Sequence, residues 1–172
     1  MKSYEFEVEG VSPLLIHQFR GQEEEKQIKA LSPKEQAAKH LYTNDGKIVI
    51  PGAHFRGSII NAMINRAIKN SKMTTKEKNA PRIAVEPFYL LIEPQKYEVN
   101  TRAIPIKQGR KSVMDFVSQP EFKTWKVKGI IKTTLDDDMK SWLVEAGENS
   151  GVGTNRVNGY GRFKVTSFKE VA

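Results

Sequence analysis

Apolar and polar residues alternate in two segments of the chain, which predicts a β-strand in each. In residues 3–11, Tyr4, Phe6 and Val8 alternate with three glutamates, and residues 162–171 alternate in a similar way. A period of two residues places the apolar side chains on one face of a sheet and the charged side chains on the other. We therefore expect two strands, each with one buried face and one solvent-exposed face.

A helical period appears in two other segments. Phe55, Ile59 and Met63 recur at four-residue steps, which predicts an amphipathic helix over residues 52–70. A similar spacing of apolar residues predicts a second helix over residues 136–148. Both helices should bury one apolar face against the sheet.

Three consecutive aspartates, Asp136, Asp137 and Asp138, open the second helix. Carboxylates at a helix start accept hydrogen bonds from its free N–H groups and complement the positive end of its dipole. Adjacent carboxylates in that place point in different directions, and no histidine lies near them in the sequence. The aspartates therefore indicate a helix cap, and we expect neither a metal site nor a cofactor.

Two further strands complete the predicted core. Residues 82–93 predict a strand that is disturbed near Pro87, and residues 122–134 predict another. The resulting order, βαββαβ, is typical of the α+β ferredoxin-like (RRM-like) fold, an antiparallel sheet with both helices on one face. We expect one domain over residues 1–172, with the other face of the sheet or its loop edges available to nucleic acid.

A polar segment at residues 21–46 interrupts this core. Ser32, Pro33 and Glu35 have the N-cap, first-turn proline and capping-box carboxylate of a short helix. The acidic run at residues 23–25 is interpreted as a solvated face without a function. The segment is predicted to be a helical insertion or a flap outside the core.

Composition narrows the class of protein and of partner. The 172 residues include no cysteine, which excludes disulfides, thiolate metal sites and cysteine nucleophiles, and fits a reducing compartment. The sequence has no apolar run long enough for a secretion signal or a membrane span, so we expect a cytoplasmic protein without membrane contact. The net charge of +8 favours a polyanionic partner, for which nucleic acid is the first choice.

Residues 151–163 combine glycine, arginine and aromatic side chains in one loop. Four glycines in thirteen positions leave the backbone free to adopt positive φ and to approach a ligand closely. Arg156 and Arg162 add positive charge, while Tyr160 and Phe163 add flat faces on which bases could stack. The loop is predicted to bind a ligand that carries phosphates and bases, and a plain glycine-rich turn is the alternative.

Two more segments carry phosphate-binding chemistry. Gly52, His54 and Arg56 open the first helix, where free N–H groups and the helix dipole attract anions. Gly52 and His54 could equally serve only as a turn and a packing residue. Basic residues outnumber acidic ones in the region that follows residue 97, and residues 97–120 are predicted to form an exposed basic loop or hairpin.

Two motifs resemble those of a known family. The segment Ile50-Pro51-Gly52-Ala53-His54-Phe55-Arg56-Gly57 is similar to the start of the first helix in the RAMP superfamily, the CRISPR-associated RNA-binding proteins with RRM-like folds. The glycine-rich loop at residues 151–163 is similar to the C-terminal glycine-rich loop of that superfamily. The chain is shorter than the typical backbone subunits and guide-processing endoribonucleases of the superfamily, which suggests a minimal or virus-borne relative.

The resemblance implies a CRISPR-associated, antiviral-defence protein that binds single-stranded, guide-like RNA within a ribonucleoprotein. Its partners would be single-stranded RNA or DNA, other CRISPR-type subunits, or further copies of itself along the RNA. RNA contact is implied at the glycine-rich loop, near Arg56 and along the basic hairpin. The predicted RNA-binding residues are Gly52, Arg56, Arg102, Lys107, Arg110, Lys111, Gly151, Gly153, Asn155, Arg156, Gly159, Tyr160, Gly161 and Arg162.

Two other functions stay open from the sequence. A metal-independent endoribonuclease needs a general base, an acid and a cation at the phosphorane. His54 is the first candidate base and His17 the second, with Tyr160 or Lys107 as acid or charge stabiliser. The other alternative is a mimic of an effector subunit that docks on a protein complex through its basic surface.

Overall fold

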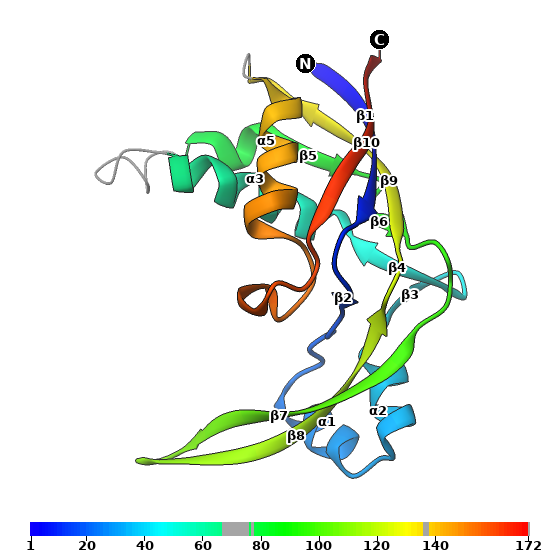
Figure 1. Ribbon diagram of the computed structural model, residues 1–172, viewed down its shortest axis with the longest axis vertical. Coiled ribbons are helices and arrows are strands. Elements are labelled where there is room, and N and C mark those ends of the chain that lie inside the picture. The colour runs from blue at the N-terminus through cyan, green and yellow to red at the C-terminus, as the bar shows by residue number, and fades with distance from the viewer. Residues whose placement is uncertain (67–75, 77, 136–137, 172) are drawn as a thin grey trace.

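The fold is that of a computed structural model, which describes residues 1–66, 76, 78–135 and 138–171. Figure 1 labels its elements. The helices are α1 (Gln22–Lys29), α2 (Pro33–Lys39), α3 (Gly52–Arg66) and α5 (Met139–Glu145), with single turns η2 (Ala80–Arg82), η3 (Ala146–Ser150) and η4 (Arg156–Asn158). The strands are β1 (Lys2–Gly10), β2 (Leu14–Leu15), β3 (Tyr42–Asn44), β4 (Lys47–Pro51), β5 (Ile83–Glu86), β6 (Tyr89–Leu91), β7 (Glu98–Gln108), β8 (Lys111–Phe122), β9 (Lys126–Thr133) and β10 (Phe163–Val171).

The main sheet has the predicted ferredoxin-like topology. Its strands lie in the order β10-β1-β9-β5, and every neighbouring pair is antiparallel. If these four strands are counted along the chain, the order is 4-1-3-2, with α3 between the first and second and α5 between the third and fourth. The predicted α+β class and βαββαβ order are therefore confirmed.

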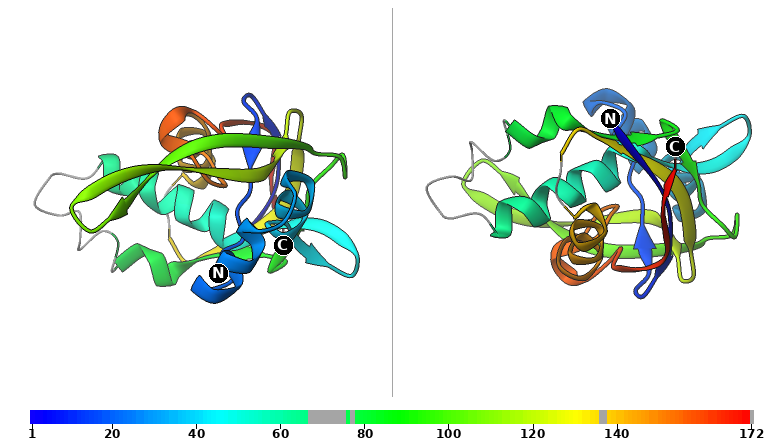
Figure 2. Two further views of the ribbon diagram at one scale, coloured as in Figure 1. Left: turned by 90° about the horizontal axis from the view of Figure 1, so that it is seen from below. Right: turned by 90° about the horizontal axis from the view of Figure 1, so that it is seen from above.

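Both helices cover one face of this sheet, as Figures 1 and 2 show. The Phe55 ring of α3 lies 5.5 Å from the rings of both Phe6 and Phe163, and Leu143 of α5 is fully buried in the same core. On the opposite face, Lys128 pairs with Glu7 at 3.2 Å. That face carries ion pairs in place of the exposed aromatic rings with which RRM sheets stack bases.

The predicted strand at residues 82–93 is in fact two strands in two sheets. β5 joins the main sheet, whereas β6 pairs with β4 in a small sheet of order β3-β4-β6. Pro87 separates them, and a proline has no N–H with which to continue a ladder. Beyond it, Leu90 is buried opposite Ile50 of the small sheet.

Two other boundaries also differ from the sequence prediction. Phe122 ends β8, and β9 begins only at Lys126, because the chain bends to bury Trp125 between them. The second helix begins at Met139, and after Glu145 it continues as a π-turn, η3, to Ser150, two residues past the predicted end. Asp138 caps it by accepting a hydrogen bond from Ser141 N at 3.1 Å, which lowers the pKa of that carboxyl. Residues 67–70 and 136–137 lie outside the described residues.

The basic region is a hairpin rather than a loop. β7 and β8 pair over eleven positions up to a turn at Gly109 and Arg110, and the hairpin projects away from the main sheet (Figure 1). The predicted insertion packs on it, because Ile28 and Ala37 are buried and Lys29 pairs with Asp115. The predicted capping box of α2 is present. The insertion is therefore held against β8 rather than standing free as a flap.

In the part of the chain that the structure describes, no helix has the length and apolar character needed to span a membrane.

Candidate nucleic-acid interface

The glycine-rich loop has the backbone conformation that its composition predicted. Its four glycines have φ values of 73°, 79°, 86° and 74° at Gly151, Gly153, Gly159 and Gly161. Asn155 also has a left-handed conformation, with φ of 57°. These conformations turn the chain back on itself between η3 and β10. Few residues other than glycine and asparagine adopt them at low cost.

Hydrogen bonds hold this loop against the segment between β1 and β2. Thr154 N donates to Leu15 O at 2.9 Å, and Gly161 N donates to Pro13 O at 2.8 Å. Ser12 Oγ accepts from Arg162 N at 2.9 Å. Much of the loop backbone is thus committed to holding its own shape. We therefore expect its side chains, more than its N–H groups, to meet a ligand.

The loop also meets the N-terminus of α3, although about a hundred residues separate them in sequence. A pocket of about 390 Å³ lies between them. Its walls include His54 and Arg56 from α3, Gly153 and Arg156 from the loop, and Lys76. Two segments that were predicted separately to bind phosphate therefore form one positively charged pocket.

His54 is mostly buried in this pocket, with its ring edge-on to Tyr42 at 5.8 Å. Burial lowers the pKa of His54 below its usual value, and the nearby positive charge of Arg156 lowers it further. The lowered pKa favours the neutral imidazole, which is the form that a general base needs. The described residues that line this pocket do not include His17 or Tyr160.

Arg56 and Gly52 have structural tasks at the same helix start. Arg56 donates from Nε to Ile83 O at 2.9 Å and from Nη2 to Ala80 O at 2.5 Å, which ties α3 to the start of β5. A Cβ on Gly52 would lie 2.9 Å from Val85 O. Both residues lie at the start of the helix, as the sequence predicted. The hydrogen bonds of Arg56 and the small size of Gly52 nevertheless serve mainly to pack α3 against β5.

The basic hairpin supplies a second positive surface. Lys107, Arg110 and Lys111 are exposed near its tip. Met114 and Phe116 on the same hairpin are also exposed, by 59% and 68%. The hairpin thus offers cations for a phosphate backbone and apolar groups for bases or a protein partner.

Arg102 and Arg162 have nitrogen atoms that are buried without a hydrogen-bond partner among the described atoms: Nε and Nη1 of Arg102, and Nη1 of Arg162. Burial lowers the pKa of Arg102, while the neighbouring Tyr160 acts to raise it. The base of the hairpin and the glycine-rich loop therefore approach each other at these side chains. Donors without a partner are costly unless a ligand or water accepts from them.

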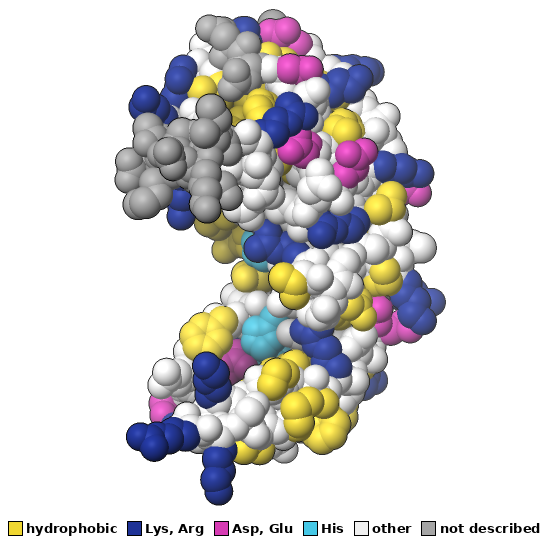
Figure 3. All heavy atoms as spheres, turned by 60° about the vertical axis from the view of Figure 1, so that its left-hand side comes forward, with side chains coloured by type: hydrophobic (Ala, Val, Ile, Leu, Met, Phe, Trp, Pro, Cys, Tyr) yellow, Lys and Arg dark blue, Asp and Glu magenta, His cyan; other side chains and the backbone are white. Residues whose placement is uncertain are grey.

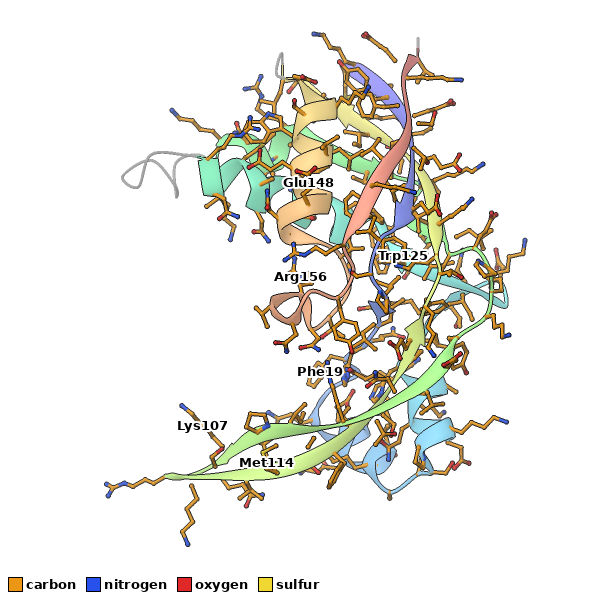
Figure 4. All side chains as sticks on the ribbon, in the orientation of Figure 1. Phe19, Lys107, Met114, Trp125, Glu148 and Arg156 are labelled. Carbon is orange, nitrogen blue, oxygen red and sulfur yellow. The ribbon has the colours of Figure 1, made fainter. Side chains whose placement is uncertain are left out.

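A hollow separates the main sheet and its helices from the hairpin with its insertion (Figure 3). Lysine and arginine side chains lie around it, and histidines appear on both of its sides. Figure 4 places Arg156 above the hollow, Lys107 on the hairpin below it and Phe19 between them. Phe19 is 65% exposed and provides a flat ring at this place.

The structure places His17 in a different cluster from His54. The His17 ring stacks on the His40 ring at 3.9 Å, and both Nε2 atoms face Glu25, at 3.5 Å and 3.4 Å respectively. Burial and His40 lower the pKa of His17, whereas Glu25 acts to raise it. The interpretation of the acidic run as a solvated face is therefore wrong for Glu25, whose side chain is only 17% exposed.

Of the comparisons with known proteins, only the one with solved structures found similar chains. No family model matches the sequence, and no curated protein does. In the cryo-EM structure of the type III-B Cmr-beta bound to cognate target RNA, one chain aligns with 99% of this chain at a TM-score of 0.65 and 9% sequence identity. Cmr6 from Pyrococcus furiosus aligns with 94% of this chain, and over 97% of its own length, at a TM-score of 0.49 and 12% identity.

The similarity to the Cmr-beta chain shows a shared fold, as the resemblance to the RAMP superfamily implied. This protein spans 60% of the length of that chain.

Several residues of the interface were not found from the sequence. Phe19 lies in a short segment without periodicity, and Lys76 lies between the predicted helix at residues 52–70 and the predicted strand at residues 82–93. Glu25 and His40 lie fifteen residues apart in a polar segment that was given no function. His40 is the histidine of this polar segment and was the signal available in the sequence for a site there. A single histidine among polar residues does not indicate a metal or binding site until the fold shows which groups lie beside it.

Proposed function

We propose that this protein binds single-stranded RNA in the hollow between its main sheet and its basic hairpin, as a subunit of a CRISPR-associated RAMP-type ribonucleoprotein. The observation that carries the proposal is the meeting of the glycine-rich loop with the start of α3 in one positively charged pocket. The shared fold with a chain of an RNA-bound complex supports it. Single-stranded DNA has the same phosphates and is the first competitor to test.

The chemistry of the hollow suits an unpaired strand better than a duplex. Arg156 and Lys107 lie on opposite sides of it and can neutralise phosphates, and Phe19 between them offers an exposed ring on which a base can stack. Tyr160, near Arg102 at the base of the hairpin, offers a second ring. Stacking on aromatic rings requires unpaired bases. The ion-paired open face of the main sheet lacks such rings, so we assign the RNA to the hollow.

Other parts of the proposal follow from the resemblance. The exposed apolar residues of the hairpin, Met114 and Phe116, would contact a neighbouring subunit or a displaced base. A cytoplasmic location belongs to the same proposal, because a cysteine-free RNA-binding subunit is suited to a reducing compartment.

Replacing Arg156 by alanine is expected to weaken the binding of single-stranded RNA about 10-fold, or by about 1.4 kcal/mol, because one charge-assisted contact is lost. Fluorescence anisotropy with a labelled oligonucleotide at several salt concentrations measures this. The slope of log affinity against log salt should fall by about 0.7 for each phosphate contact removed. Lys169→Ala on β10 removes the same charge from an exposed position near the C-terminus and is the matched control.

Equal losses in Arg156→Ala and Lys169→Ala would contradict the assignment of the loop, because net charge alone would then explain binding. A wild-type protein that binds neither RNA nor DNA would contradict the proposed function. That result would favour the protein-docking alternative.

A second function, metal-independent RNA cleavage, is favoured by one observation. Burial favours the neutral form of His54, which lies beside Arg156 in the pocket, so a base and a cation are side by side. If this function holds, RNA incubated in EDTA gives discrete fragments on a denaturing gel. His54→Ala should then lower the cleavage rate by at least about 100-fold, the usual contribution of a general base. Fragments that persist in His54→Ala would exclude this residue as the base.

A further inference from the structure

We propose that His17, Glu25 and His40 form a binding site for one divalent transition-metal ion, best suited to Zn²⁺, between the insertion and the base of the hairpin. The three side chains come from different segments. His17 follows β2, Glu25 lies on α1, and His40 directly follows α2. The ion can be tested without RNA, so either proposal can fail without the other.

The spacing of the three side chains suits a tetrahedral ion. The Nε2 atoms of His17 and His40 lie 3.5 Å and 3.4 Å from the two oxygens of Glu25. One ligand atom from each residue lies within 4.8 Å of the other two. Ligands about 2.0–2.1 Å from a tetrahedral Zn²⁺ are separated from one another by about 3.3–3.4 Å. Each nitrogen-to-oxygen distance is close to that separation, and because the two end on different oxygens of Glu25, the carboxylate would turn to offer one oxygen to the ion.

The hydrogen bond of His40 Nδ1 leaves its Nε2 directed at Glu25. His40 Nδ1 lies 3.0 Å from Ser118 O, and a carbonyl oxygen only accepts, so Nδ1 carries the hydrogen. His40 Nε2 then faces a Glu25 oxygen at 3.4 Å, and His40 is only 1% exposed. A metal ion bound to both Nε2 and the carboxylate would satisfy this contact, as a proton on Nε2 would.

The surroundings of the two histidines are those of metal ligands. A ligating histidine usually donates its second ring N–H to a carbonyl or a similar acceptor, as His40 does to Ser118. His17 Nδ1 lies 2.7 Å from the side-chain amide of Gln119. The Oε1 atom of that amide is buried without a partner among the described atoms. If the amide is rotated by 180°, Oε1 accepts from Nδ1–H and leaves Nε2 free to bind the ion.

The ligand set selects the kind of metal. Imidazole is a borderline ligand that suits Zn²⁺, a carboxylate oxygen also binds Zn²⁺, and zinc sites with two histidines and one glutamate keep a fourth position for water. The side chains of His17 and Glu25 are 22% and 17% exposed, so that position is open to solvent. Arg102 of β7 acts on His17 as a nearby positive charge, which lowers the affinity for the ion without removing its ligands.

The ion would fasten the insertion to the segment after β2, beside the base of the hairpin. Between the insertion and the hairpin, Lys29 and Asp115 form a partly exposed ion pair, and such pairs contribute little. A metal held by α1, the end of α2 and the segment after β2 would link all three where they pack on β8. The orientation of the hairpin across the hollow would then depend on metal content.

The test is a titration of the untagged protein with Co²⁺ alone, followed by displacement with Zn²⁺. We expect the visible absorption of tetrahedral Co²⁺ to saturate at one ion per chain and to disappear when Zn²⁺ is added. Glu25→Gln keeps the shape of the side chain and should weaken Zn²⁺ binding at least 10-fold, measured by competition with a chromophoric chelator. Zn²⁺ should raise the melting temperature of the wild type and leave that of Glu25→Gln unchanged.

Glu24→Gln is the matched control, because it removes the neighbouring carboxylate from the same helix and should bind Zn²⁺ as the wild type does. His17→Gln replaces Glu25→Gln if circular dichroism shows that the latter is unfolded. The proposal is overturned if the wild type gives no tetrahedral Co²⁺ spectrum. It is also overturned if Glu24→Gln loses as much affinity as Glu25→Gln.

Discussion

Replacing Gly161 by alanine should lower the free energy of unfolding by about 3–5 kcal/mol, from a backbone clash together with an unfavourable conformation. An added Cβ would lie 1.8 Å from Val152 O, and that carbonyl cannot move aside easily because Val152 N is bonded to Gly161 O. With φ of 74°, the residue would also occupy a left-handed conformation. Urea denaturation followed by circular dichroism measures the change.

Gly159→Ala separates the two causes. Gly159 has φ of 86°, but no atom lies within 4 Å of the position that its Cβ would take. This variant should lose only the conformational part, about 1–2 kcal/mol. Equal losses in the two variants would contradict the packing of the loop against Val152. If Gly161→Ala still folds, its RNA affinity reports how far the loop shape matters for binding.

Replacing Trp125 by alanine should also lower the free energy of unfolding by about 3–5 kcal/mol, the usual cost of removing a buried tryptophan. Trp125 is 1% exposed and lies where the hairpin returns to the main sheet (Figure 4). Its ring meets Phe163 edge-on at 6.3 Å, and Nε1 donates to Ser12 O at 2.9 Å. The change is again measured by urea denaturation with circular dichroism, because the substitution removes one of only two tryptophans.

Trp142→Ala is the control for this prediction. Trp142 is only partly buried, on α5, so its removal should cost less than the loss of Trp125. If Trp125→Ala proved as stable as Trp142→Ala, the hairpin would not depend on this ring for its attachment. Gly10→Ala provides an independent check, because its Cβ would lie 2.1 Å from Trp125 Nε1.

The elements that the sequence predicted best are those whose side-chain period was long and regular. β1 and β10 each alternate over about nine residues, and α3 repeats an apolar residue at every fourth position from Phe55. Periodicity of that length leaves one way to bury the apolar face. The predicted segments at residues 82–93 and 122–134 were wrong in detail, because bends at Pro87 and Trp125 depend on contacts with distant strands.

The candidate site also has features that the sequence predicted and features that it did not. Composition alone indicated the flexible backbone of the glycine-rich loop, and all four of its glycines have positive φ. The apolar period located the start of α3, and the excess of basic residues located the hairpin. It could not show that Arg156 lies beside His54, or that Arg56 would use its donors on Ala80 and Ile83.

The sequence by itself determined the class of fold, the order of its elements and the positive charge that favours a nucleic-acid partner. These depend on local periodicity and on composition, which can be read from each segment without knowing what it contacts. Only the tertiary structure decided which polar groups share a site. His17, Glu25 and His40 come together because three separate segments pack on β8, and the net burial of many distant side chains decides that packing.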